Sequence, residues 1–493
     1  MTNRLSTDTL PLLNGRIATP SYDRAALAEG VVHLGLGAFN RAHQAAYLDA
    51  IAKQGDPRWG IVGVSLRSPG VRDRLASQDG LYTLLVRDGA GEEAQVIGAL
   101  KRMLVAPEDP EAVVAAMAQP SVHLVTLTVT EKGYALDRAK GGLDTSNPDI
   151  AADLASLAAP RTAPGFIVAA LNRRRVAGLP AFTAASCDNL PHNGALLRDA
   201  VLAMARAHDA KLADWIETNG AFPASMVDRI VPATTQERID RFATDYGVLD
   251  DGLIETEPFT QWVLERNFVG EMPDLASVGV TYTAAVAPWE DAKLRMLNGA
   301  HSTLAYLGGL AGIAYVHEFV ADARRRALIE RLWDESATTL NPPPELDLAR
   351  YRADLLHRFA NPRLQHKTYQ IAMDGSQKLP QRIVAPLRAR LEAGLPSPML
   401  ELAVAAWMAW QRGVDAQGNR FTVDDPLAAK TALAWANSAS PDDACARLLA
   451  MIEIFGNVAQ QWPDLAWRTA KTLRRLIEDG PAALIADMTG AEA

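Results

Sequence analysis

The stretch Val31-Val-His-Leu-Gly35-Leu-Gly37-Ala-Phe39-Asn40-Arg41 decides how the first half of the chain folds. Residues 31–35 are typical of a short buried strand, and the helical segment 40–53 follows the Gly-rich turn. Glycines at the end of a strand allow a tight turn and a close approach of the backbone to a pyrophosphate, and a helix N-terminus supplies amide donors. The stretch therefore predicts a dinucleotide-binding turn contacted by Gly35, Gly37, Phe39, Asn40 and Arg41.

The motif alone does not decide between NAD and NADP, or between a cofactor-binding turn and a structural turn. Asn40 replaces the third glycine of the usual fingerprint, so a turn with a purely structural role is the alternative. The acidic residue that binds the ribose hydroxyls, usually about 20 residues further on, is not evident. Arg67 instead follows the second predicted strand, 59–66, and either contacts the 2′-phosphate of NADP or is a solvated loop charge. We expect NAD as the cofactor, with NADP as the alternative.

Further strands and helices alternate through the first half of the chain. The β-branched and apolar runs 121–129 and 181–186 predict strands, while 110–118 and 194–208 have helical patterns. Alternating strands and helices are typical of a parallel sheet covered on both faces. The first half is therefore predicted to be an α/β domain.

The character of the sequence changes near residue 285, where long segments rich in Ala, Leu and Arg replace the strands. Prolines at 342–344, 380 and 396 punctuate these segments. We predict two domains, a parallel-sheet dinucleotide-binding domain over 1–285 and a mostly α-helical substrate-binding and catalytic domain over 286–493. The predicted helical segments of the second domain are 290–312, 320–337, 346–359, 397–412, 426–437, 442–455 and 464–490.

Composition narrows the classes of partner and compartment. The formal net charge of −9 argues against nucleic acid as a main partner. Only two cysteines are present, which excludes a disulfide framework and suits a reducing cytoplasm. The N-terminus lacks an apolar run fit for a signal peptide, and no window approaches the ~20 apolar residues of a membrane span. We expect a cytoplasmic protein without a membrane partner.

The segment 290–301, Glu-Asp-Ala-Lys-Leu-Arg-Met-Leu-Asn-Gly-Ala-His, carries the most chemistry. At ~100° per residue, Lys293, Asn298 and His301 fit within one side of a helix. Hydride transfer from an alcohol needs a base for the hydroxyl proton and donors for the developing oxyanion. A desolvated lysine can titrate near neutrality, and an asparagine amide can hold the oxygen. The alternative is a solvated lysine and a structural histidine.

Two further segments add polar groups. Residues 186–189, Ser-Cys-Asp-Asn, follow a predicted strand, and α/β sites lie at the carboxyl ends of such strands. Residues 374–382 form a predicted loop marked by Gly and Pro, which carries the cations Lys378 and Arg382. Taken alone, each segment is equally typical of an ordinary turn.

Together these segments resemble the mannitol dehydrogenase family of polyol-specific long-chain dehydrogenases. The resemblance implies a Rossmann-type N-terminal domain, a helical C-terminal domain and catalysis without a metal; neither HExxH nor a paired CxxC occurs in the sequence. The matching pieces keep their order along nearly the whole chain: GLGAFNRAH (35–43), LTVTEKGY (127–134), SCDNLPHNG (186–194), FPASMVDRIVP (222–232), EPFTQWV (257–263), KLRMLNGAHS (293–302) and MDGSQKLPQR (373–382).

The resemblance also implies roles for individual residues. Lys293 would be the general base and acid, and Asn189 and Asn298 the pair that binds the oxyanion. His301 and Lys378 would hold the substrate. The remaining roles fall to Glu131 and Glu290, which would pass protons to solvent, and to Asp228 and Arg229, which would line the substrate cleft. Family members usually carry histidine where Asn40 stands, a change to another small polar turn residue.

Within the family, the segment 369–382 looks more like the fructuronate reductases than the mannitol 2-dehydrogenases, which tend to carry an arginine in place of Gln370. A uronate carboxylate would need cations such as Lys378 and Arg382. The alternative is a mannitol 2-dehydrogenase or an arabinitol dehydrogenase. A relative specific for sugar phosphates would need additional cations to contact the phosphate. A sensor without catalysis would have lost Lys293, Asn298 or His301. The family resemblance implies a monomer or weak oligomer.

Overall fold

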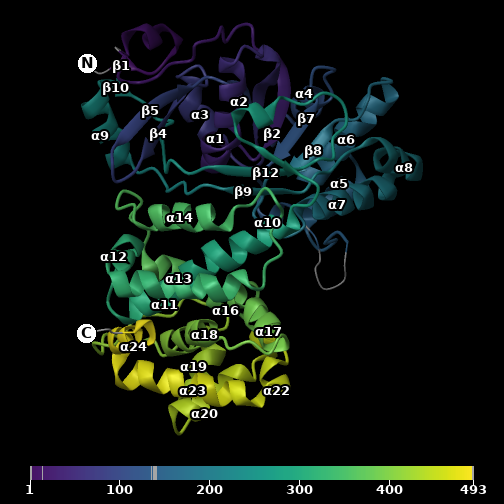
Figure 1. Ribbon diagram of the computed structural model, residues 1–493. Coiled ribbons are helices and arrows are strands. Elements are labelled where there is room, and N and C mark those ends of the chain that lie inside the picture. Colours follow the sequence, from purple (N-terminus) through teal and green to yellow (C-terminus); the bar gives the residue numbers. More distant parts are fainter. Residues whose placement is uncertain (1–2, 14, 135, 137–141, 491–493) are drawn as a thin grey trace. The chain divides into compact units, whose positions relative to one another are not determined.

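The computed structural model describes residues 3–13, 15–134, 136 and 142–490. The chain divides into two compact units, Met1–Ala287 and Pro288–Ala493, which are described separately below (Figure 1).

The first unit is built on a five-stranded sheet in which every pair of neighbouring strands is parallel. Along β2, successive side chains enter opposite clusters: Val32 packs on the face that carries α4, α6 and α7, and Val31 packs on the face that carries α2. This two-sided burial explains the near-continuous apolar strands and confirms the predicted parallel-sheet domain. The strands in sheet order are β6 (Leu100–Val105), β3 (Gly60–Ser65), β2 (Glu29–Leu34), β7 (Leu124–Leu127) and β8 (Thr183–Ser186).

Nine helices connect and flank the strands of this unit among its described residues. They are α1 (Ala38–Ala42), α2 (Gln44–Lys53), α3 (Gly70–Ala76), α4 (Pro110–Met117), α5 (Pro148–Ala155), α6 (Ala163–Val176), α7 (Asn193–His208), α8 (Ala210–Asn219) and α9 (Gln236–Tyr246).

Three small sheets that the sequence analysis did not predict complete the first unit. The antiparallel pair of β4 and β5 joins β11 in one of them, and β9 runs antiparallel to β12 in another. Their strands are β1 (Asn3–Arg4) with β10 (Val248–Leu249); β4 (Tyr82–Arg87), β5 (Glu92–Ile97) and β11 (Ile254–Thr256); and β9 (Ser225–Asp228), β12 (Gln261–Glu265) and β13 (Thr281–Thr283).

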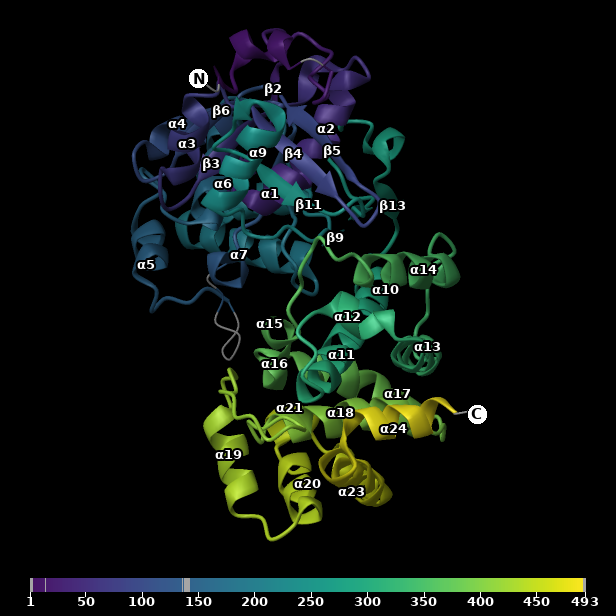
Figure 2. The same ribbon diagram turned by 90° about the vertical axis from the view of Figure 1, so that its left-hand side faces the viewer.

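Helices joined by loops make up the described part of the second unit, which confirms the prediction of a mostly helical second half. Helix α18 is buried from Met399 to Trp410 and packs against α11 and α23, so it is the centre of this core (Figure 2). Its α-helices are α10 (Ala287–Ala292), α11 (Gly299–Leu310), α12 (Val316–Ala321), α13 (Ala323–Ala337), α14 (Leu348–Phe359), α15 (Thr368–Ala372), α16 (Gly375–Leu379), α17 (Ala385–Glu392), α18 (Pro398–Trp410), α19 (Ala428–Ala436), α20 (Pro441–Leu449), α21 (Ile452–Phe455), α22 (Val458–Gln461), α23 (Pro463–Glu478) and α24 (Gly480–Thr489).

Four expected helices are interrupted. The segment 320–337 breaks at Asp322, whose ψ is 131°, and the segment 442–455 breaks at Met451, whose ψ is 94°. The segment predicted as one helix over 40–53 breaks at His43, whose φ of −117° and ψ of −88° leave the helical region. The segment 464–490 breaks at Gly480, where φ is +80° and Pro481 follows. Glycine tolerates the positive φ, and the proline withholds the N–H that a continuous helix would use.

The predicted loop over 374–382 is instead helical. Asp374 adopts a left-handed φ of +55°, α16 begins at Gly375, and a π-helix, η6 (Pro380–Val384), continues directly from it. Pro380 is tolerated because a helix that widens into a π turn no longer needs the same backbone donor there. Lys378 and Arg382 therefore project from one rigid helical element.

No helix in the described part of the chain is both long and apolar enough to cross a membrane.

Candidate active site

The Gly-rich turn lies at the switch point of the parallel sheet. From β2, the chain proceeds to β3 and β6 on one side, and later to β7 and β8 on the other. In open α/β sheets ligands bind in the crevice beyond the carboxyl ends of the strands where the order reverses. Because the turn directly follows β2, it occupies that position (Figure 1).

Close contact with the end of β7 fixes the shape of the turn. Gly35 has a φ of +101°, and a Cβ on it would lie 2.1 Å from the Thr128 carbonyl oxygen. His33 bridges the two strands, with its ring nitrogens 2.8 Å from the hydroxyls of Thr126 and Thr128. Burial lowers the pKa of His33 to about 3, so this bridge is made by a neutral imidazole. Only glycine fits the first position of the turn.

We expect Gly35→Ala to lower the melting temperature and to weaken dinucleotide binding, because it adds a backbone cost of roughly 1–3 kcal/mol to a collision with Thr128. Gly55→Ala is the matched control, since Gly55 has a similar φ of +98° with open space around the added Cβ. Thermal unfolding and a fluorescence titration with NADH compare the two. Equal losses in both variants would show that the contact with Thr128 is unimportant.

The residues predicted to bind the cofactor differ in their burial and in their contacts. Gly37 and Phe39 are half-buried, and a Cβ at Gly37 would approach only the Gly35 carbonyl, at 3.6 Å. Asn40 is buried, with its Nδ2 3.4 Å from Gln44 Oε1. Arg41 is also buried, donating 2.7 Å to the Gly252 carbonyl oxygen and stacking over the Tyr82 ring. The backbone of the turn is thus available to a ligand, whereas these two polar side chains hold the fold.

Arg67 is exposed after β3, at the same edge of the sheet as the turn. Within the described residues it forms no ion pair, so a dinucleotide phosphate would meet no competing carboxylate there.

Two loops at the same edge meet through a carboxylate. The loop after β7 contains the short 3₁₀ turn Glu131–Tyr134, and the loop after β8 contains Asp188 and the exposed Asn189. Asp188 accepts hydrogen bonds from the backbone N–H groups of Val129 and Thr130 at 3.1 and 2.8 Å. The side chain of Glu131 lies outside the described residues.

Asp228 and Arg229 follow β9 in the first unit. Asp228 is buried, and the Arg229 guanidinium donates to the backbone carbonyls of Ala42 and Glu257 at 2.5 and 3.0 Å. Burial lowers the pKa of Arg229 to about 10. These contacts tie the end of the first helix after the turn to the β9 region, so Arg229 has a structural task in addition to any contact with substrate.

In the second unit, a π-helix carries the predicted base. The segment Lys293–Asn298, labelled η5, forms this π-helix between α10 and α11, so the expected regular α-helical spacing of Lys293, Asn298 and His301 is wrong. The indole N–H of Trp333 donates 2.8 Å to the Met296 carbonyl oxygen, a backbone acceptor within the widened turn. Single π turns inside helices are frequent at functional sites.

The residues of this π-helix are held in an interior setting. Lys293 is only 7% exposed, and Glu290 is half-buried one turn earlier. The Oδ1 atom of Asn298 is buried without a hydrogen-bond partner. Buried acceptors without partners are rare in stable cores, so Asn298 Oδ1 is suited to accept a hydrogen bond from a polar ligand group.

His301 lies against aromatic rings. Its ring centroid is 4.7 Å from that of Phe359 and 5.1 Å from that of His366. Burial, followed by His366, Arg358 and Arg382, holds the pKa of His301 well below its usual range. Burial, followed by Arg358 and Lys378, lowers the pKa of His366 to about 4. Both imidazoles are therefore neutral near pH 7 and offer hydrogen bonds without charge.

Lys378 and Arg382 lie beside this pair. Lys378 Nζ donates to the Met373 carbonyl oxygen at 2.5 Å, and burial, followed by Arg382, lowers its pKa. Arg382 donates 3.1 Å from Nη1 to Ser302 Oγ, and burial lowers its pKa to about 10. No carboxylate of the described chain pairs with Arg382, whereas Asp374 lies 4.0 Å from Lys378.

A close approach of two helices brings these groups together. A Cβ on Gly299 would lie 3.1 Å from the Arg382 carbonyl oxygen, so the glycine lets the start of α11 pack against η6. This contact places the element that carries His301 beside the element that carries Arg382.

Sequence reasoning missed His366, Arg358 and Asp188. His366 lies in the segment 361–367, which has no periodic pattern, and only the tertiary fold brings its ring to His301. Asp188 belongs to the predicted site segment 186–189, but the segment alone indicates no role for it. A carboxylate that follows a buried strand beside a predicted site asparagine was the available signal.

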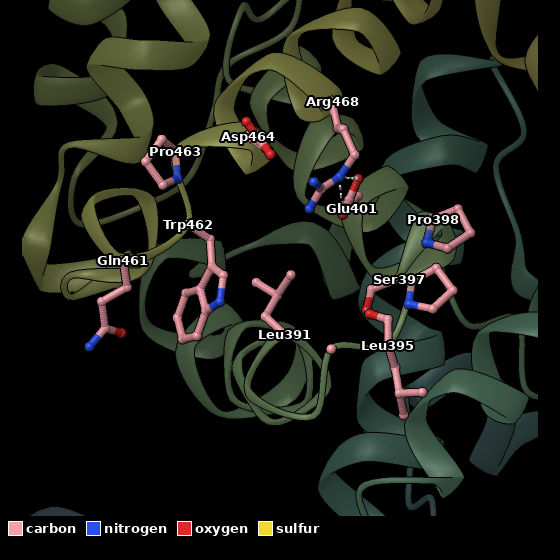
Figure 3. A pocket seen from close by; sticks show the side chains of 12 residues that line it. Leu391, Leu395, Ser397, Pro398, Glu401, Gln461, Trp462, Pro463, Asp464 and Arg468 are labelled. Carbon is pink, nitrogen blue, oxygen red and sulfur yellow. Dashed lines mark hydrogen bonds and ion pairs between the residues drawn. The ribbon is translucent and has the colours of Figure 1, made fainter.

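A pocket of about 610 Å³ opens elsewhere in the second unit, and no predicted site residue lines it. Figure 3 shows Trp462, Leu391 and Leu395 on its walls and the Arg468 guanidinium directed at the Glu401 carboxylate, 2.9 Å from it. Its surface is mainly apolar, and the ion pair satisfies its buried acid. In the described ranges, no group of three or more His, Cys, Asp or Glu could hold a metal ion.

Comparison with known proteins places this geometry in a family. The Mannitol dehydrogenase Rossmann domain matches residues 29–277, and the Mannitol dehydrogenase C-terminal domain matches residues 285–477. The chain is 44% identical over 475 residues to the D-mannonate oxidoreductase of Escherichia coli (strain K12), covering 95% of this chain and 98% of that protein. It is 42% identical over 419 residues to a mannitol 2-dehydrogenase of Phaeosphaeria nodorum, covering 84% and 74%.

A solved structure agrees with both matches. Pseudomonas fluorescens mannitol 2-dehydrogenase, in a ternary complex with NAD and D-mannitol, superimposes with a TM-score of 0.83 at 38% identity, covering 98% of this chain and 99% of that one. The chain therefore belongs to the mannitol dehydrogenase family and is an oxidoreductase that acts on the CH–OH groups of polyols or aldonates.

Proposed function

We propose that this protein is a fructuronate reductase, which interconverts a keto-uronate and the corresponding aldonate, D-mannonate, with NAD as the cofactor. The observation that carries this proposal is the Arg382 guanidinium, partly buried beside His301 and without a carboxylate partner among the described residues. A buried guanidinium is costly unless it is paired, and a substrate carboxylate supplies the missing partner. The D-mannonate oxidoreductase relative supports the same substrate class.

The cofactor assignment is supported by the turn and by a relative. The mannitol 2-dehydrogenase of Pseudomonas fluorescens was solved with NAD. The half-buried backbone of Gly35 and Gly37 at the switch point fits a pyrophosphate, which needs close backbone approach. The first domain, 1–285, is thus proposed to bind the dinucleotide, and the second, 286–493, to supply acid–base and substrate groups. NADP, through Arg67, is the alternative.

The proposed chemistry is proton transfer coupled to hydride transfer. The bound dinucleotide would supply the hydride chemistry, as the acceptor in alcohol oxidation and as the donor in carbonyl reduction. Lys293 takes the hydroxyl proton during oxidation and returns it to the carbonyl oxygen during reduction. Asn298 donates from its amide to that oxygen as negative charge develops there. The neutral imidazole of His301 hydrogen-bonds the substrate hydroxyls.

The other residues assigned by family resemblance keep their proposed roles. Asn189 is a second donor to the oxyanion, Glu131 and Glu290 relay the proton to solvent, and Asp228 and Arg229 contact substrate. Lys378 holds substrate hydroxyls or the carboxylate.

A substrate screen tests the proposal. We expect NADH oxidation with fructuronate to exceed that with fructose by at least about tenfold in kcat/KM, because one charge-assisted contact contributes about 1.5–3 kcal/mol. Tagaturonate and xylulose are run in parallel, each with NADH and NADPH. A preference for fructose would replace the uronate assignment with the mannitol 2-dehydrogenase alternative, which the Phaeosphaeria nodorum relative supports.

A further inference from the structure

A strained residue stands directly before Glu131 in the loop after β7. Thr130 has a φ of +66°, the left-handed region that β-branched residues rarely adopt. Such a conformation persists only when the surrounding contacts impose it, and it clusters at functional sites. A contact from a neighbouring loop imposes this conformation on Thr130.

The contact comes from Asp188, on the loop after β8. One carboxylate oxygen accepts from the Thr130 N–H at 2.8 Å. The other accepts from the Val129 N–H at 3.1 Å and from the Tyr134 hydroxyl at 2.8 Å. The Asp188 side chain thus binds Val129, the strained Thr130 and Tyr134, which ends the following 3₁₀ turn.

Asp188 is itself fixed on the fold. Its backbone carbonyl accepts from Asn193 Nδ2 at 2.9 Å, and the same amide donates to the Ser225 carbonyl in β9 at 2.7 Å. Strands β7 and β8, which carry the two loops, are hydrogen-bonded neighbours (Figure 1). Only 8% of Asp188 is exposed. A rigid and largely dry carboxylate can hold a turn that would otherwise relax.

We propose that Asp188 is a positioning residue whose carboxylate clamps the strained turn at Thr130 and thereby fixes the backbone at Glu131, the residue proposed for the proton relay. The link to Glu131 rests on the proposed function. The clamp itself rests only on contacts within the first unit. The same contacts fix the start of the loop that presents Asn189.

Asp188→Asn tests the clamp with nearly unchanged shape. The amide offers one acceptor oxygen to three donors and turns N–H groups toward the rest, so the turn should loosen. We expect kcat to fall about tenfold or more, as one lost charge-assisted contact implies, while KM and the NADH Kd change little. Hydrogen–deuterium exchange of the backbone amides in 127–134 should become faster.

Asp153→Asn is the matched control. Asp153 is also a buried carboxylate that accepts from two backbone N–H groups, those of Arg161 and Thr162, and from one hydroxyl, that of Thr162. It lies on α5, and its hydrogen bonds go to Arg161, Thr162 and His208 and not to residues 127–134 or 186–189. The variant should lower the melting temperature as much as Asp188→Asn without changing kcat or the exchange of 127–134. Equal effects of both variants on kcat would overturn the proposal.

A rescue variant separates positioning from general damage. Thr130→Gly removes the cost of the positive φ, because glycine adopts that region freely. In the Asp188→Asn background it should restore at least about a third of the lost activity, since the turn then needs less restraint. Tyr134→Phe removes one of the three donors and should give a smaller loss if Asp188→Asn does not fold. No rescue, together with unchanged exchange in Asp188→Asn, would overturn the clamp.

Glu131→Gln separates failure of the clamp from failure of the proposed function. If Glu131→Gln leaves kcat unchanged, the relay role is wrong, and faster exchange in Asp188→Asn still supports the clamp. If Glu131→Gln lowers kcat but Asp188→Asn does not, the positioning role is overturned.

Discussion

Replacing Lys293 by alanine should lower kcat by about 10²–10⁴-fold, the contribution of a general acid–base group, and leave the Kd for NADH nearly unchanged. The side chain is 7% exposed on a π-helix of the second unit, while the dinucleotide turn belongs to the first. Stopped-flow measurement of the hydride-transfer step and a fluorescence titration with NADH give the two quantities separately.

Lys293→Arg separates a base from a fixed positive charge. A guanidinium keeps the charge but does not give up a proton in proteins, so Lys293→Arg should be as inactive as Lys293→Ala if the lysine transfers a proton. Arg295→Ala is a control on the same helix, because Arg295 donates to Thr339 and stabilises the element without a proposed role in catalysis. A Lys293→Ala variant that retains more than about a tenth of the wild-type rate would remove Lys293 from this role.

Four strands of the parallel sheet were predictable because they are buried on both faces, whereas the edge strand β6 is exposed or half-buried at residues 101–104 and was not predicted. The runs 31–35 and 59–66 are apolar and flanked by glycine or polar turns, and they correspond to β2 and β3. The expected strand over 121–129 contracts to Leu124–Leu127, since the residues after it leave the ladder to form the loop that Asp188 holds. Burial pattern thus predicted the strands, while tertiary contacts set their ends.

The small sheets escaped prediction for a different reason. Strands β4 and β5 flank Asp88-Gly-Ala-Gly91, a turn sequence typical of hairpins, so the signal was present. Strands β9 to β13 are short, and their partners are distant in sequence; β11, for example, pairs with β4. Pairing of this kind cannot be read from a local pattern.

At the candidate site, sequence predicted residue types better than geometry. Lys293, Asn298 and His301 do share one continuous helical element, but the turn between the first two is a π-helix, which periodicity at 3.6 residues per turn does not anticipate. Gly375 and Pro380 suggested a loop, and the chain is helical there because packing overrides the weak local preference. His366 reaches His301 only through the tertiary fold.

The carboxylate assignment leads to a second large effect, a loss of substrate discrimination in Arg382→Ala. We expect kcat/KM for fructuronate to fall about ten- to a hundredfold, equivalent to a charge-assisted contact of about 1.5–3 kcal/mol, while any rate with fructose changes much less. The ratio of the two substrates is the measured quantity, because a general loss of stability would lower both rates together.

Two further variants identify the cause of that loss. Arg382→Lys keeps the charge but loses the planar fork, so it should retain part of the preference for fructuronate if the contact is bidentate. Arg388→Ala is the matched control, since Arg388 is a half-buried arginine six residues further on, in α17, with no proposed contact to substrate. It should leave the ratio unchanged. If Arg382→Ala lowers the rates with fructuronate and fructose equally, the guanidinium supports the helix packing at Ser302 and the carboxylate binds elsewhere.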